Sequence, residues 1–404
     1  MARRCSFCGE DRRGVDRLIA GHGGVAICGD CARLAAELST VPHDPPTGDL
    51  LLVDIGTLVT NDGRHGGLLG RIEGAAVAVR NGRITWLGRQ RALPDRYREL
   101  PLVECEGRLV VPGFVDAHRH LVAHPGMDLA GFSDLVVDQM GVGLEQGTTT
   151  QEMRTWAAPD PETDVMMLSA VRVAGETIPT DTVPTVVVGT DPPARGRGYR
   201  AMVESVLLPT AARVAGFVDV VVGGPLRDED AAGVMSVARR IGLGSRVHVH
   251  DAGSLQVALD GGAVSVDGMW GMEDAAAMVV EAHKVVVSLP ATSWITGQAD
   301  PARAMWDEGA TVALGTGCEG GSVPTMPMAM SAAVYHGDLS PERALWSATR
   351  GGALALREPD KGRVALGSVA DLIVMEAETA ADIVDEPGRD PVVRVIKDGV
   401  PLGT

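Results

Sequence analysis

Aromatic residues are scarce in this chain. They make up 3% of its 404 residues, so a hydrophobic core has to be built from Val, Ala, Leu, Ile and Met. The hydrophobic share is nevertheless 45%, and together with 51 glycines it indicates a globular protein with many turns. A chain of this length can form one large domain and small satellites.

Long apolar runs are also missing. No stretch reaches the roughly 18 residues that a membrane-spanning helix needs, and residues 1–5 do not begin the apolar core of a signal peptide. We therefore expect a cytoplasmic protein without membrane contact. Its net charge of −17 argues against bulk nucleic-acid binding, because nucleic acids are polyanions.

Cysteine is rare except at the N-terminus, where four of the six cysteines fall within 31 residues. Cys5 and Cys8 form one Cys-x-x-Cys pair, and Cys28 and Cys31 form a second. In a reducing compartment this spacing predicts a structural zinc site with four thiolate ligands rather than disulfides. A segment of about 40 residues cannot bury enough core alone, and a metal supplies the missing stability.

This N-terminal segment, residues 1–41, resembles the zinc-binding domain of the ClpX unfoldase. Gly9, the stretch 15–21 and Ile27 match that pattern beside the cysteines. In that family the domain dimerises and docks other proteins, so the resemblance implies homodimerisation or protein docking. DNA binding is a weaker alternative, because six arginines face five acids over residues 1–40. The proline-rich residues 42–48 are expected to be a linker.

The rest of the chain divides into β-rich flanks and an alternating middle. Residues 49–109 and 362–404 show β-type patterns, with an Asn-Gly turn at 81–82 that favours a hairpin. Between them, apolar runs alternate with Ala-rich helical stretches, as in a parallel barrel. We place strands at 110–116, 148–153, either 183–188 or 166–173, 218–222, 246–250, 263–267, 285–289 and 311–314.

Two histidine pairs lie at the ends of expected strands. His118 and His120 follow the apolar run 110–116, which we interpret as one buried strand, and His248 and His250 end a later strand. Alternate residues of a strand point the same way, so each pair can direct two imidazoles into one space. Imidazole nitrogens are ligands that suit zinc or iron.

The order of motifs resembles the amidohydrolase superfamily, in particular imidazolonepropionase-like enzymes. The matching motifs are Pro-Gly-Phe-Val-Asp-x-His-x-His at 112–120, Gly-Thr-Thr-Thr at 147–150, and the tail at 367–374. The resemblance implies a (β/α)8 barrel at 110–361 beside a composite β-sandwich from both flanks. It also implies a metal-dependent hydrolase of C–N bonds, with zinc or iron held by His118, His120 and His248.

Two positions depart from that family's metal site. Gly268 stands where the family has a ligand histidine, unless the register is shifted by one and Asp267 serves instead. Gly317 stands where the family has an aspartate that binds metal and accepts a proton. Cys318 or Glu319 could replace it, and Glu319 is the better catalytic candidate because it shares the side of Gly317 on an extended chain.

The expected substrate pocket departs as well. Arg154 takes the place of a family lysine, Glu176 takes the place of a substrate-binding histidine, and Glu152 lies close by. Arg154 suits an acidic ligand but cannot be carboxylated to bridge two metals. We assign Glu152 and Arg154 to substrate binding, or alternatively to an ion pair, and His250 and Glu176 to catalysis. Imidazolonepropionase activity itself is not expected.

Two functions follow from these residues. The first is a metalloenzyme that acts on a C–N bond of a small cyclic or amide substrate, with room for non-hydrolytic chemistry because of Gly317. The second is a catalytically decayed barrel that serves as a binding or scaffold protein through its finger. The metal content of the barrel is the feature that separates them.

Overall fold

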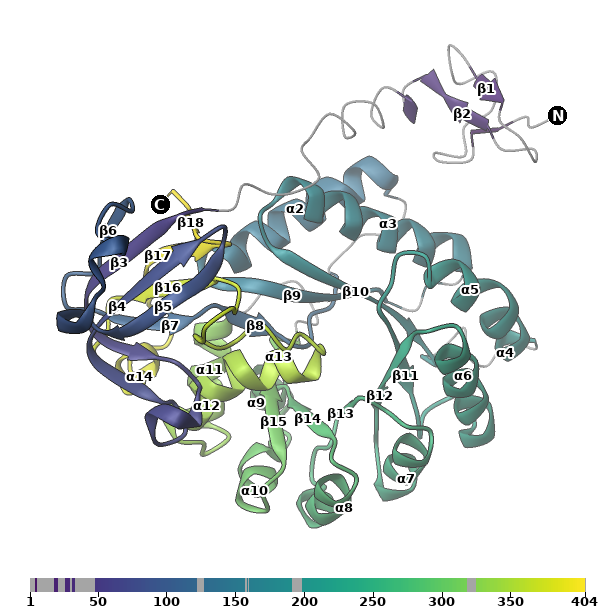
Figure 1. Cartoon of the computed structure of the whole chain (residues 1–404). Helices are drawn as coiled ribbons and strands as arrows, with labels where there is room; N and C mark the ends of the chain where they lie inside the picture. The colour runs from purple at the N-terminus through teal and green to yellow at the C-terminus, as the bar shows by residue number, and fades with distance from the viewer. Residues whose placement is uncertain are drawn as a thin grey trace.

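The structure is a computed structural model. It describes residues 4–5, 18–20, 26–29, 31–32, 48–121, 127–156, 158, 160–190, 198–317 and 325–403. The larger described part contains two sheets of eight strands each. One sheet curls into a ring with helices outside it, and the other lies beside the ring (Figure 1). The predicted barrel with a composite β-domain is therefore confirmed.

The ring is a parallel barrel whose strands follow chain order. Neighbouring strands pair in parallel throughout, for example Val187 with Asp219 and Val220 with Val247. Most predicted strands are present, and the ambiguous third is β10, because residues 166–173 lie in a helix. The barrel strands are β8 (Phe114–Asp116), β9 (Thr148–Arg154), β10 (Asp181–Val188), β11 (Phe217–Val221), β12 (Gly244–His248), β13 (Ser265–Asp267), β14 (Val285–Ser288) and β15 (Thr311–Leu314).

Backbone hydrogen bonds join the first and last strands just beyond their ends. Ala117 donates to the Leu314 carbonyl at 3.2 Å, and Gly317 donates to the His118 carbonyl at 2.8 Å. The residues after β8 and β15 are thus held side by side. The His118 region is thereby tied to Gly317, although 199 residues separate them in sequence (317 − 118).

The helices that surround the barrel begin at conventional caps. Asp128 accepts from the backbone of Gly131, Asp160 accepts from Thr163, and Asp251 forms a capping box with Ser254. The helices are α2 (Leu129–Glu145), α3 (Pro161–Thr177), α4 (Tyr199–Met202), α5 (Leu208–Ala211), α6 (Asp228–Arg240), α7 (Ala252–Asp260), α8 (Ala276–Glu281), α9 (Pro290–Thr296), α10 (Ala302–Asp307), α11 (Met326–Tyr335), α12 (Pro341–Trp346), α13 (Gly352–Ala355) and α14 (Ala380–Val384).

The predicted single strand 110–116 is two strands in two different sheets. Residues 109–112 form β7 (Leu109–Pro112) of the flanking sheet, whereas β8 begins the barrel after Gly113. Pro112 cannot donate a backbone hydrogen bond, so it suits the end of a strand. A Cβ at Gly113 would lie 2.2 Å from the Thr149 hydroxyl, so only glycine fits where the chain crosses between sheets. The continuous apolar run hid this break.

The flanking sheet combines both ends of the described chain. Strand β16 pairs with β7 and β17, which joins residues near 372–397 to residues near 110. The hairpin turn at Asn81 and Gly82 has φ of 49° and 69°, as a type I′ turn requires. The remaining strands are β3 (Leu50–Val59), β4 (Arg71–Arg80), β5 (Arg83–Arg89), β6 (Leu102–Glu104), β16 (Leu372–Met375), β17 (Val392–Lys397) and β18 (Val400–Pro401).

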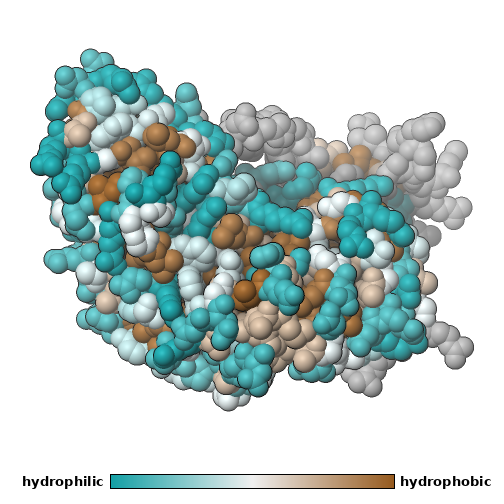
Figure 2. Space-filling view, turned by 60° about the horizontal axis from the view of Figure 1, so that its bottom comes forward, coloured by the Kyte–Doolittle hydropathy of each residue, from teal (hydrophilic) through white to brown (hydrophobic). Residues whose placement is uncertain are grey.

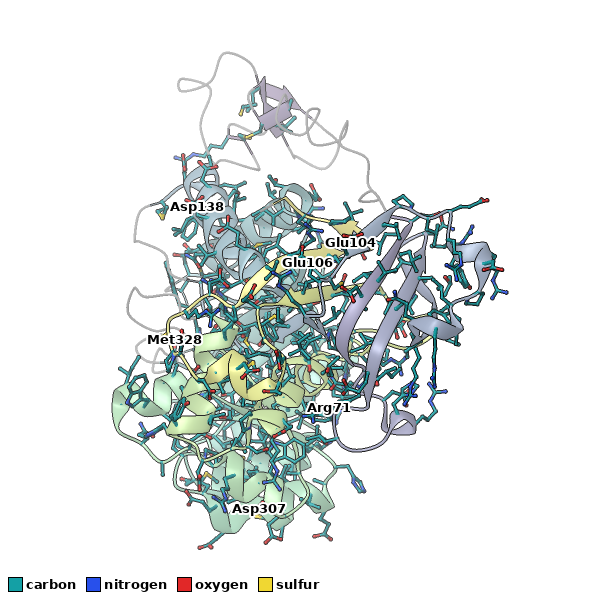
Figure 3. The ribbon with its side chains drawn as sticks, turned by 90° about the vertical axis from the view of Figure 1, so that its left-hand side faces the viewer. Arg71, Glu104, Glu106, Asp138, Asp307 and Met328 are labelled. Carbon is teal, nitrogen blue, oxygen red and sulfur yellow. The ribbon has the colours of Figure 1, made fainter. Side chains whose placement is uncertain are left out.

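Charged pairs join the flanking sheet to the barrel. The buried Lys397 amine of β17 lies 2.9 Å from Asp181 of β10 and 3.1 Å from Asp371. On the outside, Arg71 of β4 pairs with Glu342 of α12 at 3.1 Å, where the sheet meets the helices (Figure 3). The exposed pair of Arg71 and Glu342 contributes little to folding stability. The buried Lys397 needs its carboxylates, because an unpaired buried charge destabilises the folded state.

The surface carries hydrophobic residues in separate small groups among hydrophilic ones, on the face that Figure 2 shows. No helix in the described ranges is long and apolar enough to cross a bilayer.

Candidate functional site

The C-terminal ends of β8, β12 and β13 bring three histidines and one aspartate to one end of the barrel. His118 and His120 follow β8, and their Nε2 atoms lie 3.0 Å apart. Asp267 ends β13 and is fully buried between two imidazoles. It accepts from His248 Nδ1 at 2.6 Å and lies 3.1 Å from His118 Nδ1. Asp267 is therefore the residue that organises the site.

This arrangement sets the tautomers of two imidazoles. A carboxylate at Nδ1 keeps the proton on that nitrogen, so Nε2 of His118 and of His248 is left as an acceptor or ligand atom. His248 is partly exposed, whereas His118 is buried. The sequence suggested Asp267 only as a substitute in a shifted register, and the structure shows it as the shared partner of two predicted metal ligands.

Arg154 ends β9 beside His120, and its side chain lies inside the barrel. Its side chain is fully buried, and its three nitrogens contact three acids. Nε lies 2.9 Å from Glu152, Nη1 lies 2.7 Å from Asp219, and Nη2 lies 3.2 Å from Asp267. A guanidinium engaged on all its nitrogens has no edge for a substrate carboxylate. The substrate-binding role predicted for Arg154 is corrected to the buried ion pair that was its alternative.

Glu152 is equally enclosed. It is fully buried, accepts from the Thr185 hydroxyl at 2.6 Å, and lies 3.2 Å from Nε of Arg246. Arg246 in turn donates to the Ala117 carbonyl at 2.8 Å. The substrate contact predicted for Glu152 is therefore replaced by a structural one, and the barrel interior holds a connected network of acids and arginines.

Burial and these contacts shift several pKa values. Burial raises the pKa of Asp219 to about 6, against the lowering effect of Arg154. Burial acts to raise the pKa of Asp267 too, but His118, Arg154 and the His248 hydrogen bond hold it well below its usual range. Burial together with the Arg154 charge lowers the pKa of His120 to about 4.

The two histidines that contact Asp267 have pKa values shifted in opposite directions. Burial and the Arg154 charge outweigh Asp267 and hold the pKa of His118 well below its usual range. For His248, burial acts to lower the pKa, but the Asp267 hydrogen bond and charge outweigh it and raise the pKa. His118 is therefore neutral, whereas His248 is the more basic imidazole of the array.

Of the two predicted catalytic residues that the structure describes, one lies beside the array and one does not. His250 lies beyond β12 and is exposed, and its ring meets the His248 ring edge-on with centroids 5.0 Å apart, while its backbone N–H donates to the Ser254 hydroxyl. Glu176 lies in the last turn of α3 and pairs with Arg172 at 3.5 Å. Because α3 leads back to the start of β10, its C-terminal turn lies at the opposite end of the barrel from the histidines. Glu176 is therefore not part of this site.

The two glycines that break the family pattern have backbones that favour glycine. Gly268 has a φ of 73°, and a Cβ there would lie 2.5 Å from His248 Cε1. Gly317 has a φ of 72°, and a Cβ there would lie 2.4 Å from the Thr292 hydroxyl. Residues with a side chain rarely adopt such φ values. Cys318 and Glu319, the proposed replacements, lie outside the described residues.

The described barrel residues do not form a three-ligand metal site. The Nε2 atoms of His118 and His120 converge, but no three ligand atoms of described His, Cys, Asp or Glu residues in the barrel lie within 4.8 Å of one another. His248 is turned with its Nδ1 toward Asp267 instead. Catalytic zinc sites use three protein ligands, so the set His118, His120 and His248 stays a prediction, in which the first two imidazoles already converge.

The finger does show a ligand cluster. The sulfurs of Cys5, Cys28 and Cys31 lie within 4.8 Å of one another, which fits three corners of a tetrahedral zinc site. Cys8, the fourth predicted ligand, lies outside the described residues. Strands β1 (Leu18–Ala20) and β2 (Ala26–Cys28) pair beside this cluster.

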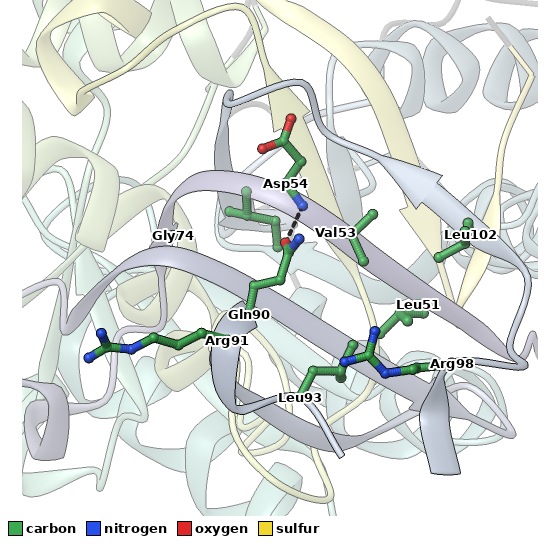
Figure 4. A pocket seen from close by; sticks show the side chains of 10 residues that line it. Leu51, Val53, Asp54, Gly74, Gln90, Arg91, Leu93, Arg98 and Leu102 are labelled. Atoms are coloured by element: carbon green, nitrogen blue, oxygen red, sulfur yellow. Dashed lines mark hydrogen bonds between the residues drawn. The ribbon is translucent and has the colours of Figure 1, made fainter. Parts of the chain in front are cut away.

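A cavity of about 680 Å³ lies on the flanking sheet (Figure 4). Its lining mixes apolar side chains of β3 with polar ones, among them Asp54, Gln90, Arg91 and Arg98. None of its lining residues is a histidine or a cysteine, and Asp54 donates its backbone N–H to Gln90 at 2.6 Å. The cavity contains none of the predicted site residues, so the candidate active site stays at the barrel end.

Sequence reasoning missed Asp219 and Arg246 as site residues. Asp219 is a charged residue in the otherwise apolar strand β11, and Arg246 lies in the middle of β12. On a strand, Arg246 shares its side with His248, so the period of two could have placed it inside the barrel. The period of two therefore indicates that Arg246 points into the barrel. It does not distinguish a residue of a buried ion network from a residue at the mouth of the barrel.

Comparison with known proteins agrees with the fold and the motifs. A family model described as the amidohydrolase family matches residues 225–402, and one described as the ClpX C4-type zinc finger matches residues 3–40. The imidazolonepropionase of Salinispora arenicola is 32% identical over 392 residues, covering 87% of this chain and 98% of that protein. The imidazolonepropionase of Mycolicibacterium smegmatis is also 32% identical, covering 87% and 96%.

Solved structures share the fold at low sequence identity. A triazine hydrolase variant has a TM-score of 0.72 at 16% identity and covers 88% of this chain and 94% of its own. An adenosine deaminase from Xanthomonas campestris with bound zinc has a TM-score of 0.69 at 19% identity and covers 88% and 93%. The chain therefore belongs to the amidohydrolase family of metal-dependent C–N bond hydrolases, and it carries an N-terminal zinc finger of the ClpX type.

Proposed function

We propose that this chain cleaves a C–N bond in a small cyclic or amide molecule at the C-terminal end of its barrel, with His248 as the general base. The observation that carries the proposal is the 2.6 Å contact between His248 Nδ1 and Asp267. It directs the proton to Nδ1 and leaves Nε2 able to take a proton from water. The relatives that are imidazolonepropionases support a cyclic amide-type substrate.

The partial exposure of His248 supports this role. Its side chain is 18% exposed, and Gly268 adds no side chain at the place where a Cβ would lie 2.6 Å from Nε2. The raised pKa of His248 also suits a base that works near neutral pH. His118 and His120 are the described side chains that would hold a metal ion, zinc or iron, and such an ion would polarise a carbonyl oxygen.

The experiment is a hydrolysis assay of the full chain against lactams, hydantoins, cyclic ureides and imidazolones, with addition of one water followed by mass spectrometry. We expect turnover of at least one class, and a loss of about 100-fold or more in His248→Gln because a general base contributes on that order. His65→Gln is the matched control, since His65 is exposed in the short 3-10 helix between β3 and β4. Equal rates for both variants would contradict the assignment of the base.

The scaffold alternative is favoured by one observation, the incomplete set of metal ligands in the described barrel. If the chain is a scaffold, we expect the same compounds to bind to it without being converted. Isothermal titration with each compound separates the two, since heat of binding without product is the outcome expected of a scaffold.

We also propose that the finger binds one zinc and mediates self-association or docking to another protein. The converging sulfurs of Cys5, Cys28 and Cys31 support this, together with the ClpX-type match. A Cys28→Ser, Cys31→Ser double variant is expected to lose one zinc per chain and to have a lower mass by light scattering. An unchanged zinc content would contradict the zinc site, and an unchanged mass would leave docking to another protein as its role.

A further inference from the structure

The guanidinium of Arg154 places a positive charge inside the barrel. Glu152, Asp219 and Asp267 come from three different strands, and each has an oxygen within 3.2 Å of one nitrogen of Arg154. Arg154 is fully buried, as are Glu152 and Asp267, and Asp219 is nearly so. Carboxylates removed from water need a positive charge close by, because the energetic cost of burying an unpaired charge is large.

The geometry of this cluster is specific to arginine. Its three contacts leave the guanidinium in three directions, from Nε, Nη1 and Nη2, and they reach strands β9, β11 and β13. Arginine presents donors in a planar fork, whereas a lysine amine is a point charge that cannot span three partners in the same way. A single side chain therefore connects acids that lie across the barrel.

Asp267 links this cation to the histidines. Its Oδ2 atom lies 3.2 Å from Arg154 and 3.1 Å from His118, and its Oδ1 accepts from His248. We propose that Arg154 supplies the fixed positive charge of the barrel interior and positions Asp267, so that His118 and His248 keep their orientation whether or not a metal ion is bound. Arg154 is thus a positioning residue that acts through Asp267, and its role does not depend on the proposed reaction.

The proposal is consistent with the ligand geometry. No three described ligand atoms converge in the barrel, yet the buried charges of the interior are paired with one another. Arg246 adds a second cation beside Glu152 at 3.2 Å. Protein groups therefore balance the charges of the acids that contact Arg154 and Arg246.

The test uses the full chain labelled with ¹⁵N-histidine, in which NMR reports which ring nitrogen carries the proton. Resonances are assigned with His118→Gln and His248→Gln. Treatment with a chelator removes bound metal, including finger zinc. We expect the His118 and His248 rings to keep their Nδ1–H tautomer, and the midpoint of barrel unfolding to move by less than about 2 °C. Rings that change tautomer on chelation and recover with zinc would overturn the proposal.

The variants test Arg154 itself. We expect Arg154→Met to lose the ordered Nδ1–H signals, and Arg154→Lys to retain them in part because it keeps the charge. If Arg154→Met does not fold, Arg154→Met with Asp219→Asn removes one acid together with the cation and should refold without restoring the two tautomers. Arg303→Met, an exposed arginine of α10, is the control. Ordered Nδ1–H signals in either Arg154→Met protein would overturn the proposal. Ordered signals in the unsubstituted chain, without hydrolysis of any tested compound, would contradict only the proposed reaction.

Discussion

Replacing Arg154 by methionine is expected to lower the free energy of unfolding by about 3–5 kcal/mol, the range seen when one partner of a buried ion pair is removed. The substitution keeps most of the side-chain volume but leaves Glu152, Asp219 and Asp267 without their shared cation. Urea unfolding at pH 7, followed by circular dichroism, measures the change.

The pH dependence of this variant has a definite sign. Burial raises the pKa of Asp219 to about 6 although Arg154 lowers it, so without Arg154 the folded-state pKa of Asp219 lies further above its unfolded value. The contribution of Asp219 to the variant's stability is then greatest at low pH and is lost as pH rises through the folded-state pKa. Part of the deficit relative to the native protein should therefore disappear at pH 5.

Arg303→Met is the matched control for this measurement. Arg303 is about half exposed and pairs with Asp307 at 3.4 Å, so its loss is expected to change stability by less than about 1 kcal/mol. If Arg154→Met were no more destabilised than Arg303→Met, the acids of the interior would not need the guanidinium, and the network would be incidental to the fold.

The barrel could be predicted from sequence because its strands are short apolar runs separated by Ala-rich helices. Strands β11, β12 and β15 lie within one or two residues of the predicted spans. The third strand was ambiguous because residues 166–173, which lie in α3, are mostly apolar, and a short apolar run fits either structure. Pairing with β9 and β11, which only the folded chain shows, identifies β10.

The site was harder to predict than the fold. His118, His120 and His248 were found from the period of a strand, and all three lie at the same end of the barrel. Their relation to one another depends on Asp267, whose side chain reaches two imidazoles from a third strand. Such a contact is set by the curvature of the barrel, and spacing along the chain does not encode it.

Glu176 and Arg154 show why residue type alone misled. Glu176 was placed by a motif whose register does not hold, because the segment is the end of a helix rather than of a strand. Arg154 was correctly placed inside the end of the barrel. The sequence of a strand, however, does not show whether a charged side chain contacts a ligand or a buried acid. Only the three contacts decide between these roles.

Placing a histidine at position 268, where the motif comparison predicts the family's ligand unless Asp267 takes its place, is expected to destabilise the protein rather than complete a metal site. Gly268 has a φ of 73°, a conformation that costs a residue with a Cβ about 1–2 kcal/mol. Its Cβ would also lie 2.5 Å from His248 Cε1 and 2.8 Å from the Val249 carbonyl oxygen. Overpacking of this kind costs about 1–3 kcal/mol more.

Gly271→His separates these two costs, because Gly271 has a similar φ of 67° but no neighbouring atom within 4 Å of the position that a Cβ would take. Both variants bear the backbone strain, and only Gly268→His bears the overlap with His248. We expect Gly268→His to be less stable than Gly271→His by about 1–3 kcal/mol in urea unfolding, and to gain no zinc beyond that of the finger. If the two variants were equally stable and Gly268→His bound an additional zinc, the space beside His248 would still accept a ligand imidazole, and the loss of the family histidine would be a change of one side chain rather than of the site's geometry.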